Sequence, residues 1–112
     1  MIRHVVMWEL KDKAEGSSKE KNAKKMKLIL EGLKINIDEI KNVEVGININ
    51  EVGININDED DSGDAWDVVL ISDFETELDY TMYTRNAHYK KAIKFINAVI
   101  KERRFVDYKM DV

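Results

Sequence analysis

The chain repeats one heptapeptide without a mismatch: Glu-Val-Gly-Ile-Asn-Ile-Asn occupies residues 44–50 and again residues 51–57. Its alternation of apolar and polar residues is typical of a β-strand, in which successive side chains point to opposite faces. Because seven is odd, Val45 and Val52 would fall on opposite faces of one regular strand. Either a bulge absorbs one residue, or one copy pairs in the sheet while the other is displaced. We interpret the repeat as an engineered or recent duplication of a strand.

Composition and charge narrow the class of protein. The 112 residues are enough for one domain, residues 1–112, although a chain of this size buries more apolar surface when it pairs with a second copy. A formal net charge of -4 disfavours nucleic acid as a partner. The sequence has no cysteine, so it has no disulfide framework and no thiolate metal site. It also lacks a signal-peptide pattern and an apolar run of 18 residues, so we expect a cytoplasmic protein with no membrane partner.

Hydrophobic periodicity predicts the order strand, helix, strand, strand, helix, strand. Residues 2–10 carry apolar side chains on both alternating faces, which is typical of a strand covered on two sides. Ser17 followed by Glu20 has the capping-box pattern of a helix start. The predicted strands are residues 2–10, 43–57, 66–74 and 105–112. The first predicted helix is 18–33. The second begins at residue 76 and is interrupted at Arg85 and Asn86.

This order is the split arrangement of a ferredoxin-like βαββαβ domain, an α+β fold with an antiparallel sheet. Helices can cover only one face of such a sheet. Since several strands are apolar on both faces, the face without helices also needs a cover, and a second subunit can supply it. We therefore expect a homodimer in which two sheets enclose a barrel-like interior, a dimeric α+β barrel.

Four segments together resemble the stress-responsive A/B barrel domain (Dabb) family. They are residues 1–10, 43–46, 66–75 and 102–108, and the resemblance covers essentially the whole chain apart from the duplicated heptad. It implies a dimeric α+β barrel with no cofactor. Most bacterial members have no established activity, whereas a plant member performs a cofactor-free aldol condensation, and the wider scaffold also carries monooxygenases and haem-degrading enzymes.

The resemblance makes His88 the first candidate for a catalytic base, because it matches the last histidine of the family's His-Pro-x-His segment. Near the start of a helix capped by Asn86, the helix dipole disfavours imidazolium and keeps a neutral base available. Arg85 and Asn86 replace the first histidine and the proline of that segment, and Met82 stands where the cyclase has its tyrosine. Tyr83, one place away, is the candidate hydrogen-bond donor. The alternative is a histidine that only caps the helix or lies at the rim.

His4 is the second histidine of the chain, and it shares its strand face with Val6 and Trp8. The resemblance points its side chain toward the barrel interior, where it would bind or orient a ligand. The favoured alternative is a buried histidine hydrogen-bonded to a neighbouring backbone group or carboxylate. The cavity that we expect is lined by Trp8, Trp66, Leu70 and Phe74, with polar groups from His4, His88 and Tyr83.

The acidic segment 58–64 begins like a calcium-binding loop, with oxygen-bearing side chains followed by a glycine. Counting from Asp58, the twelfth position is Val69, where such a loop needs a bidentate glutamate. Two histidines alone also make no convincing metal site. We therefore predict a solvated loop and no metal.

Two classes of function remain open. In the first, the barrel is a binding or enzymatic cavity that receives a small hydrophobic carbonyl compound, with His88 as base in the enzymatic version, a cyclase or a monooxygenase-like enzyme. In the second, the chain is a stress-associated assembly protein whose barrel is filled by side chains. An enzyme requires an open cavity that reaches its base, whereas an assembly protein tolerates a packed one.

Overall fold

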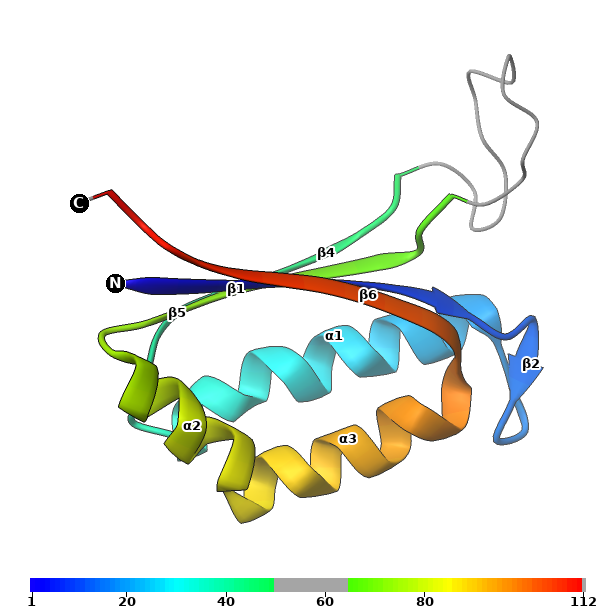
Figure 1. Ribbon diagram of the computed structural model, residues 1–112. Coiled ribbons are helices and arrows are strands. Elements are labelled where there is room, and N and C mark those ends of the chain that lie inside the picture. The colour runs from blue at the N-terminus through cyan, green and yellow to red at the C-terminus, as the bar shows by residue number, and fades with distance from the viewer. Residues whose placement is uncertain (50–64, 112) are drawn as a thin grey trace.

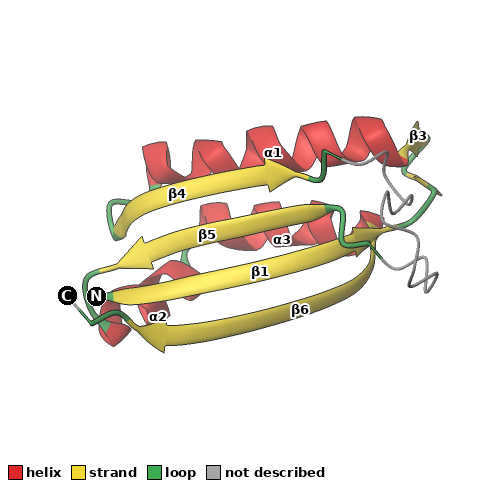
Figure 2. Cartoon of the chain, turned by 90° about the horizontal axis from the view of Figure 1, so that it is seen from above, coloured by secondary structure: helices red, strands yellow, loops and turns green. Residues whose placement is uncertain are grey.

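Four antiparallel strands form the main sheet, and three helices pack against one of its two faces (Figure 1). The computed structural model describes residues 1–49 and 65–111. The strand order is β4-β5-β1-β6, which Figure 2 shows from above. In chain order the elements are β1 (Ile2–Leu10), β2 (Lys13–Ala14), β3 (Ser17–Ser18), α1 (Lys19–Asn36), β4 (Ile40–Ile47), β5 (Val68–Phe74), α2 (Glu77–Arg85), α3 (Ala87–Val99) and β6 (Ile100–Lys109). The predicted ferredoxin-like α+β fold is confirmed.

The central strand β1 shows the alternation that its sequence predicts. The side chains of Ile2, Val6 and Leu10 are buried beneath the helices, whereas those of Val5 and Met7 are half-buried on the other face. The helices cover the first face only (Figure 1). The second face, which we call the helix-free face, carries no element among the described residues.

The hydrophobic core lies between the sheet and the apolar sides of α1 and α3. Met26 and Leu30 of α1 and Ile96 and Val99 of α3 are buried against the sheet, together with Phe74 of β5. Recurrence of apolar residues every three or four positions places these side chains on one side of each helix. The sheet and the three helices therefore share one continuous core.

Some element boundaries differ from those predicted. The cap of α1 is Ser18, whose side chain accepts from the backbone N–H of Lys21, in place of Ser17. The helix also continues to Asn36, since the buried Ile37 keeps the following turn against the core. At the other end of the chain, β6 begins at Ile100 instead of Phe105, because α3 passes into the strand without an intervening loop.

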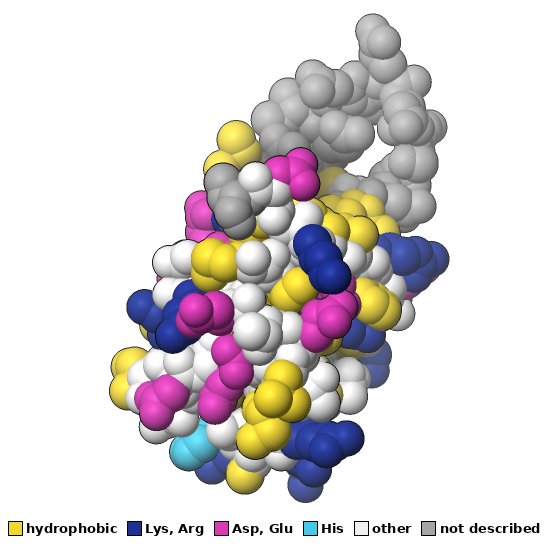
Figure 3. All heavy atoms as spheres, turned by 60° about the vertical axis from the view of Figure 1, so that its left-hand side comes forward, with side chains coloured by type: hydrophobic (Ala, Val, Ile, Leu, Met, Phe, Trp, Pro, Cys, Tyr) yellow, Lys and Arg dark blue, Asp and Glu magenta, His cyan; other side chains and the backbone are white. Residues whose placement is uncertain are grey.

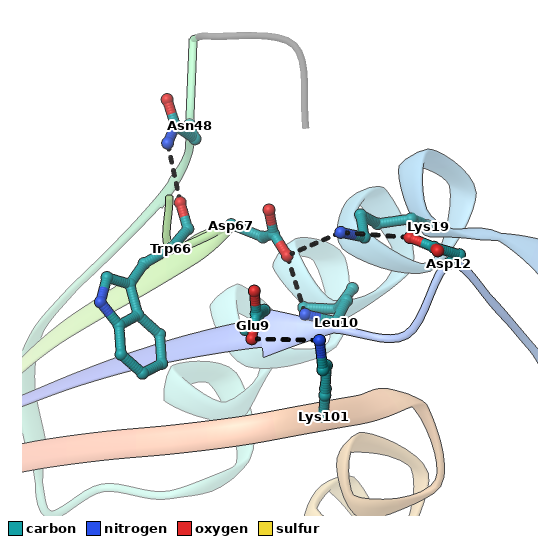
Figure 4. Close-up of polar contacts among 8 residues, drawn as sticks. All are labelled: Glu9, Leu10, Asp12, Lys19, Asn48, Trp66, Asp67 and Lys101. Carbon is teal, nitrogen blue, oxygen red and sulfur yellow. Dashed lines mark hydrogen bonds and ion pairs between the residues drawn. The ribbon is translucent and has the colours of Figure 1, made fainter. Parts of the chain in front are cut away.

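The connection between β4 and β5 is anchored at its two described ends (Figure 4). The Asp67 carboxylate, buried just before β5, accepts a hydrogen bond of 2.8 Å from the backbone N–H of Leu10 and lies 3.5 Å from the Lys19 ammonium. Asn48 donates from its side-chain amide to the carbonyl oxygen of Trp66 at 2.8 Å. These contacts tie the start of β5 to both β1 and α1.

The sheet uses the first copy of the repeated heptad. Glu44, Val45 and Gly46 lie opposite residues 69–71 of β5, and β4 ends at Ile47, inside that copy. The second copy, 51–57, lies outside the described residues, as does the acidic segment 58–64 that we predicted to be a loop. No helix among the described residues is long and apolar enough to cross a membrane.

Deleting residues 51–57 tests whether the first copy is sufficient. Because the pairing with β5 is made by residues 40–47, we expect the deletion to preserve it. Deleting either copy gives the same sequence, so the result does not depend on which copy is removed. Hydrogen exchange should show the amides of Gly46 and Val69, which lie opposite each other, equally protected in both proteins. Loss of that protection would mean that the second copy is needed to hold β4.

Candidate functional site

A row of polar side chains crosses the helix-covered face of the sheet. Ser72 of β5, His4 of β1 and Asp107 of β6 lie opposite one another in the register of the three strands. The exposed fraction is 1% for Ser72 and 3% for His4. Buried polar groups are costly unless they find partners, so this row stands out from the apolar residues around it.

The imidazole of His4 is held by Asp107. Its Nδ1 makes a short hydrogen bond with the Asp107 carboxylate, and the Tyr80 hydroxyl lies 3.4 Å from the same nitrogen. Burial lowers the pKa of His4 below its usual value, while Asp107 acts in the opposite direction. A neutral imidazole that donates from Nδ1 has its acceptor at Nε2. The pair therefore presents an oriented hydrogen-bond acceptor.

Aromatic rings surround this pair. The ring of Tyr80 lies 5.1 Å from that of His4, and Phe105 of β6 lies 6.4 Å from it on the same face. Phe74 packs against both Tyr80 and Tyr83, at 5.3 and 4.9 Å between ring centroids. Burial raises the pKa of Tyr80 to about 12 and also raises the pKa of Tyr83. Both phenols therefore keep their protons near neutral pH.

A cavity of about 350 Å³ opens between β6 and α2. Its lining includes Tyr80 and Asp107, the two side chains that contact His4. The remaining lining residues are Ile2, Glu77, Thr81, Tyr108 and Lys109. His4 thus lies directly behind the inner wall of this cavity. Figure 3 shows the molecule with its α2 side brought forward, where acidic, basic and apolar side chains are intermixed.

Several residues predicted to form the site are near one another. Trp8, Leu70 and Phe74 are buried on the same face of the sheet as His4. Tyr83 is also buried and contacts Phe74. This face is covered by the helices, because the even-numbered residues of β1 point toward them. The predicted position in a barrel interior between two sheets is therefore corrected, since these side chains point away from the face that a second sheet would cover.

His88 lies elsewhere. As predicted, it follows the cap residue Asn86, whose side-chain oxygen accepts a 2.8 Å hydrogen bond from the His88 backbone N–H. Its side chain is exposed and lines a groove between α1 and α3, together with residues such as Leu28 and Phe95. Among the described residues, no contact joins His88 to the His4–Asp107 pair.

The expected position of Trp66 is corrected by the structure. We predicted that it shares a strand face with Leu70 and Phe74, but β5 begins only at Val68. Trp66 lines a hollow with Met7 and Val69 of the helix-free face. The Arg104 guanidinium lies 6.0 Å from the centre of its ring on that side. Trp66 and Trp8 therefore do not line one cavity.

Tyr80, Asp107 and Ser72 were not predicted from the sequence. Tyr80 lies one helical turn before Tyr83, so helical spacing alone could have identified it. Asp107 and Ser72 become neighbours of His4 only through the register of β1 with β6 and β5. The available signal was strand alternation, which places both side chains on the face toward the helices. The ferredoxin-like strand order then puts their strands on either side of β1.

Comparisons with known proteins agree with this architecture. The model of the stress-responsive A/B barrel domain family matches residues 2–110, whereas curated proteins gave no match. A Bacteroides fragilis structure described as a dimeric protein of unknown function with a ferredoxin-like fold is 26% identical, with a TM-score of 0.77 over 97% of this chain and 95% of that one. A hydroxynitrile lyase from Passiflora edulis is 14% identical, with a TM-score of 0.73 over 98% and 93%. A putative antibiotic biosynthesis monooxygenase from Nitrosomonas europaea is 15% identical, with a TM-score of 0.70 over 100% of both chains.

The pH dependence of stability tests the neutral state of His4. Because burial lowers its pKa below 6.5, the unfolded chain takes up a proton here as the pH falls, while the folded protein does not. The contribution of His4 to the free energy of unfolding is therefore complete above pH 6.5 and is lost as the pH falls toward the pKa of the folded state. In urea unfolding at two pH values, one unit above and one unit below 6.5, wild type should lose more stability than His4→Gln as the pH falls. Equal losses would contradict a neutral His4.

Proposed function

Since the chain belongs to the stress-responsive A/B barrel domain family, we propose that it forms a homodimer and binds a small, mostly apolar carbonyl compound beside His4. The observation that carries the proposal is the buried imidazole of His4, which is held by the partly exposed Asp107 carboxylate and lies among aromatic rings behind a cavity. The rings offer apolar contact area, and the oriented imidazole offers one polar contact.

A buried histidine is costly if it serves packing alone, because a polar group loses its contacts with water when it is buried. His4 is 3% exposed, and the Asp107 carboxylate that holds it is 30% exposed and lines the cavity. Tyr80 adds a protonated hydroxyl to the same place. The concentration of these groups next to a cavity favours a ligand site on the helix-covered face of the sheet.

General base catalysis is the second candidate function, and the orientation of His4 favours it. A carboxylate that holds Nδ1–H leaves Nε2 free to accept a proton from a bound compound, while the protonated Tyr80 can donate to it. The solved structures described as a lyase and a putative monooxygenase indicate that this fold accommodates enzymes. The catalytic assignments of His88 and Tyr83 stay predictions, and the geometry favours His4 and Tyr80 in these roles.

The helix-free face supports the homodimer. The centre of its middle rows is apolar, with Ile71, Val5 and Val106 side by side across three strands and Val69 and Met7 in the next row. Glu44 and Arg104 lie at the outer ends of these rows. A single layer of strands leaves this apolar surface half-exposed, and a second copy would cover it. The 26% identical Bacteroides fragilis protein is described as dimeric.

A bidentate ion pair lies at the edge of the same face. The Arg3 guanidinium donates to both oxygens of Asp73, at 2.8 and 3.0 Å, and the Asn42 amide donates to the same carboxylate at 3.2 Å. Arg3 holds the pKa of Asp73 below its usual value. Because its hydrogen bonds are already made within one subunit, this pair can enter an interface without a partner charge.

Binding of two compounds of matched shape tests the ligand site. Acetophenone and α-methylstyrene differ only in a carbonyl oxygen replaced by a methylene group. We expect wild type to bind acetophenone more tightly, and His4→Phe to lose about tenfold in acetophenone affinity because the polar partner is removed. Titrations followed by amide chemical shifts give both dissociation constants.

The same titration distinguishes the two histidines. If His4 carries the polar contact, His88→Ala should bind acetophenone as wild type does. A loss in His88→Ala with none in His4→Phe would instead favour the base predicted from sequence. If wild type bound neither compound, the ligand proposal would fail and a packed assembly protein would be favoured.

A charge on the helix-free face tests the dimer. Val106 is 54% exposed in the single chain, so Val106→Glu is tolerated by the fold but places an unpaired charge in the proposed interface. We expect sedimentation to show a dimer for wild type and a 13.1 kDa monomer for the variant. Ile35→Glu is the matched control, because Ile35 is 83% exposed on α1. A monomeric wild type, or a dimer that survives Val106→Glu unchanged, would contradict this interface.

A further inference from the structure

We propose that the hydroxyl of Ser72 is a ligand-binding group that donates a hydrogen bond to the carbonyl oxygen of the bound compound. The inference rests on the proposed ligand site beside His4 and extends it, since it assigns a donor for the oxygen and thereby a class of ligand. Ser72 was not among the residues that the sequence pointed to.

The Ser72 hydroxyl is buried without a hydrogen bond. Among the described residues, its Oγ has no partner, although the residue is almost fully enclosed. A buried hydroxyl that leaves water without gaining a hydrogen bond destabilises the folded state, and alanine would fill the same position at no such cost. An unpaired polar group of this kind calls for an explanation, and an oxygen supplied by a ligand provides one.

Two other buried polar atoms also lack partners, but their surroundings differ. Asp67 leaves Oδ1 unpaired while its Oδ2 is bonded to Leu10 at the far end of β1. The indole nitrogen of Trp8 is unpaired in the row that contains Val68 and Arg103. Only Ser72, of these three residues, lies directly opposite His4.

The strand order places Ser72 on the side of His4 that Asp107 does not occupy. β1 lies between β5 and β6, so Asp107 approaches His4 from one side and Ser72 faces it from the other. Directly opposed residues of an antiparallel pair have Cβ atoms about 4.5–5.5 Å apart. Since Nδ1 is turned to Asp107 on β6, the opposite edge of the imidazole, which carries Cδ2 and ends in Nε2, is on the side of β5 and Ser72. A ligand atom at this edge would contact both groups.

The two groups are complementary in polarity. The Ser72 hydroxyl can donate, and the Nε2 atom of neutral His4 can only accept. A compound that fits both has an acceptor oxygen beside a weakly acidic hydrogen, as an enolisable ketone does. Neither His4 nor Ser72 lines the cavity at Tyr80 and Asp107, so such a compound would have to pass these two side chains to place its carbonyl between His4 and Ser72.

Ser72→Ala tests the inference, because stability and affinity should change in opposite directions. Removing an unpaired buried hydroxyl should raise the urea midpoint of the free protein. It should also weaken acetophenone binding about fivefold or more and leave α-methylstyrene binding unchanged. Ser72→Thr keeps the hydroxyl and should keep the preference for acetophenone. Ser17→Ala removes the same atoms on β3, which lies at the end of the molecule opposite α2 (Figure 2), and should leave that preference at the wild-type value.

The outcomes separate this inference from the proposed function. If wild type preferred acetophenone and His4→Phe lost the preference while Ser72→Ala kept it, the ligand site would stand and the role of Ser72 would be rejected. A lower urea midpoint in Ser72→Ala with an unchanged ratio of the two affinities would show a structural hydroxyl and would also reject it. If wild type bound neither compound, the proposed site and this inference would fail together.

Discussion

The position of β1 between β5 and β6 is the constraint on which the rest of the structure depends. Because the side chains of a strand alternate, this one strand supplies both faces of the sheet. Its even-numbered residues form the floor of the core, and the register of its two neighbours places Ser72 and Asp107 on either side of His4. Its odd-numbered residues run along the helix-free face, and Arg3 meets Asp73 at the edge of that face. The candidate ligand site and the proposed interface are therefore opposite sides of one strand.

Different interactions stabilise the two faces of the sheet. The core between sheet and helices is stabilised by apolar burial, with Phe74, Met26 and Ile96 fully enclosed. Within it, the His4 imidazole and the unpaired Ser72 hydroxyl are polar groups that an optimised core would not contain. On the helix-free face, by contrast, Arg3 and Asp73 satisfy each other in two hydrogen bonds. Ser72 is the unpaired polar group that lies opposite His4, where a ligand could complete its hydrogen bonding.

Much of the fold could be predicted because its signals are local. Alternation in residues 2–10 and the order of the elements indicated a ferredoxin-like sheet, and Asn86 was correctly identified as a helix cap. The candidate site was harder to predict, because Asp107 is far from His4 in sequence and only the strand register brings them together. Trp66 was assigned to the wrong face because alternation was extended two residues beyond the start of β5. His88 matched a family segment, but the rotation of α3 turns its side chain toward α1.

The strand β6 carries alternating residues of the site and of the helix-free face. Phe105 and Asp107 face His4, whereas Val106 and Tyr108 face the opposite side, and α3 joins the strand without a loop. A rigid strand cannot shift one set of side chains without shifting the other. If a ligand repositions β6, it also changes the surface offered to a second subunit, and subunit association must then change ligand affinity by the same factor. An edge strand of ten residues would in this way couple occupancy of the cavity to assembly of the protein.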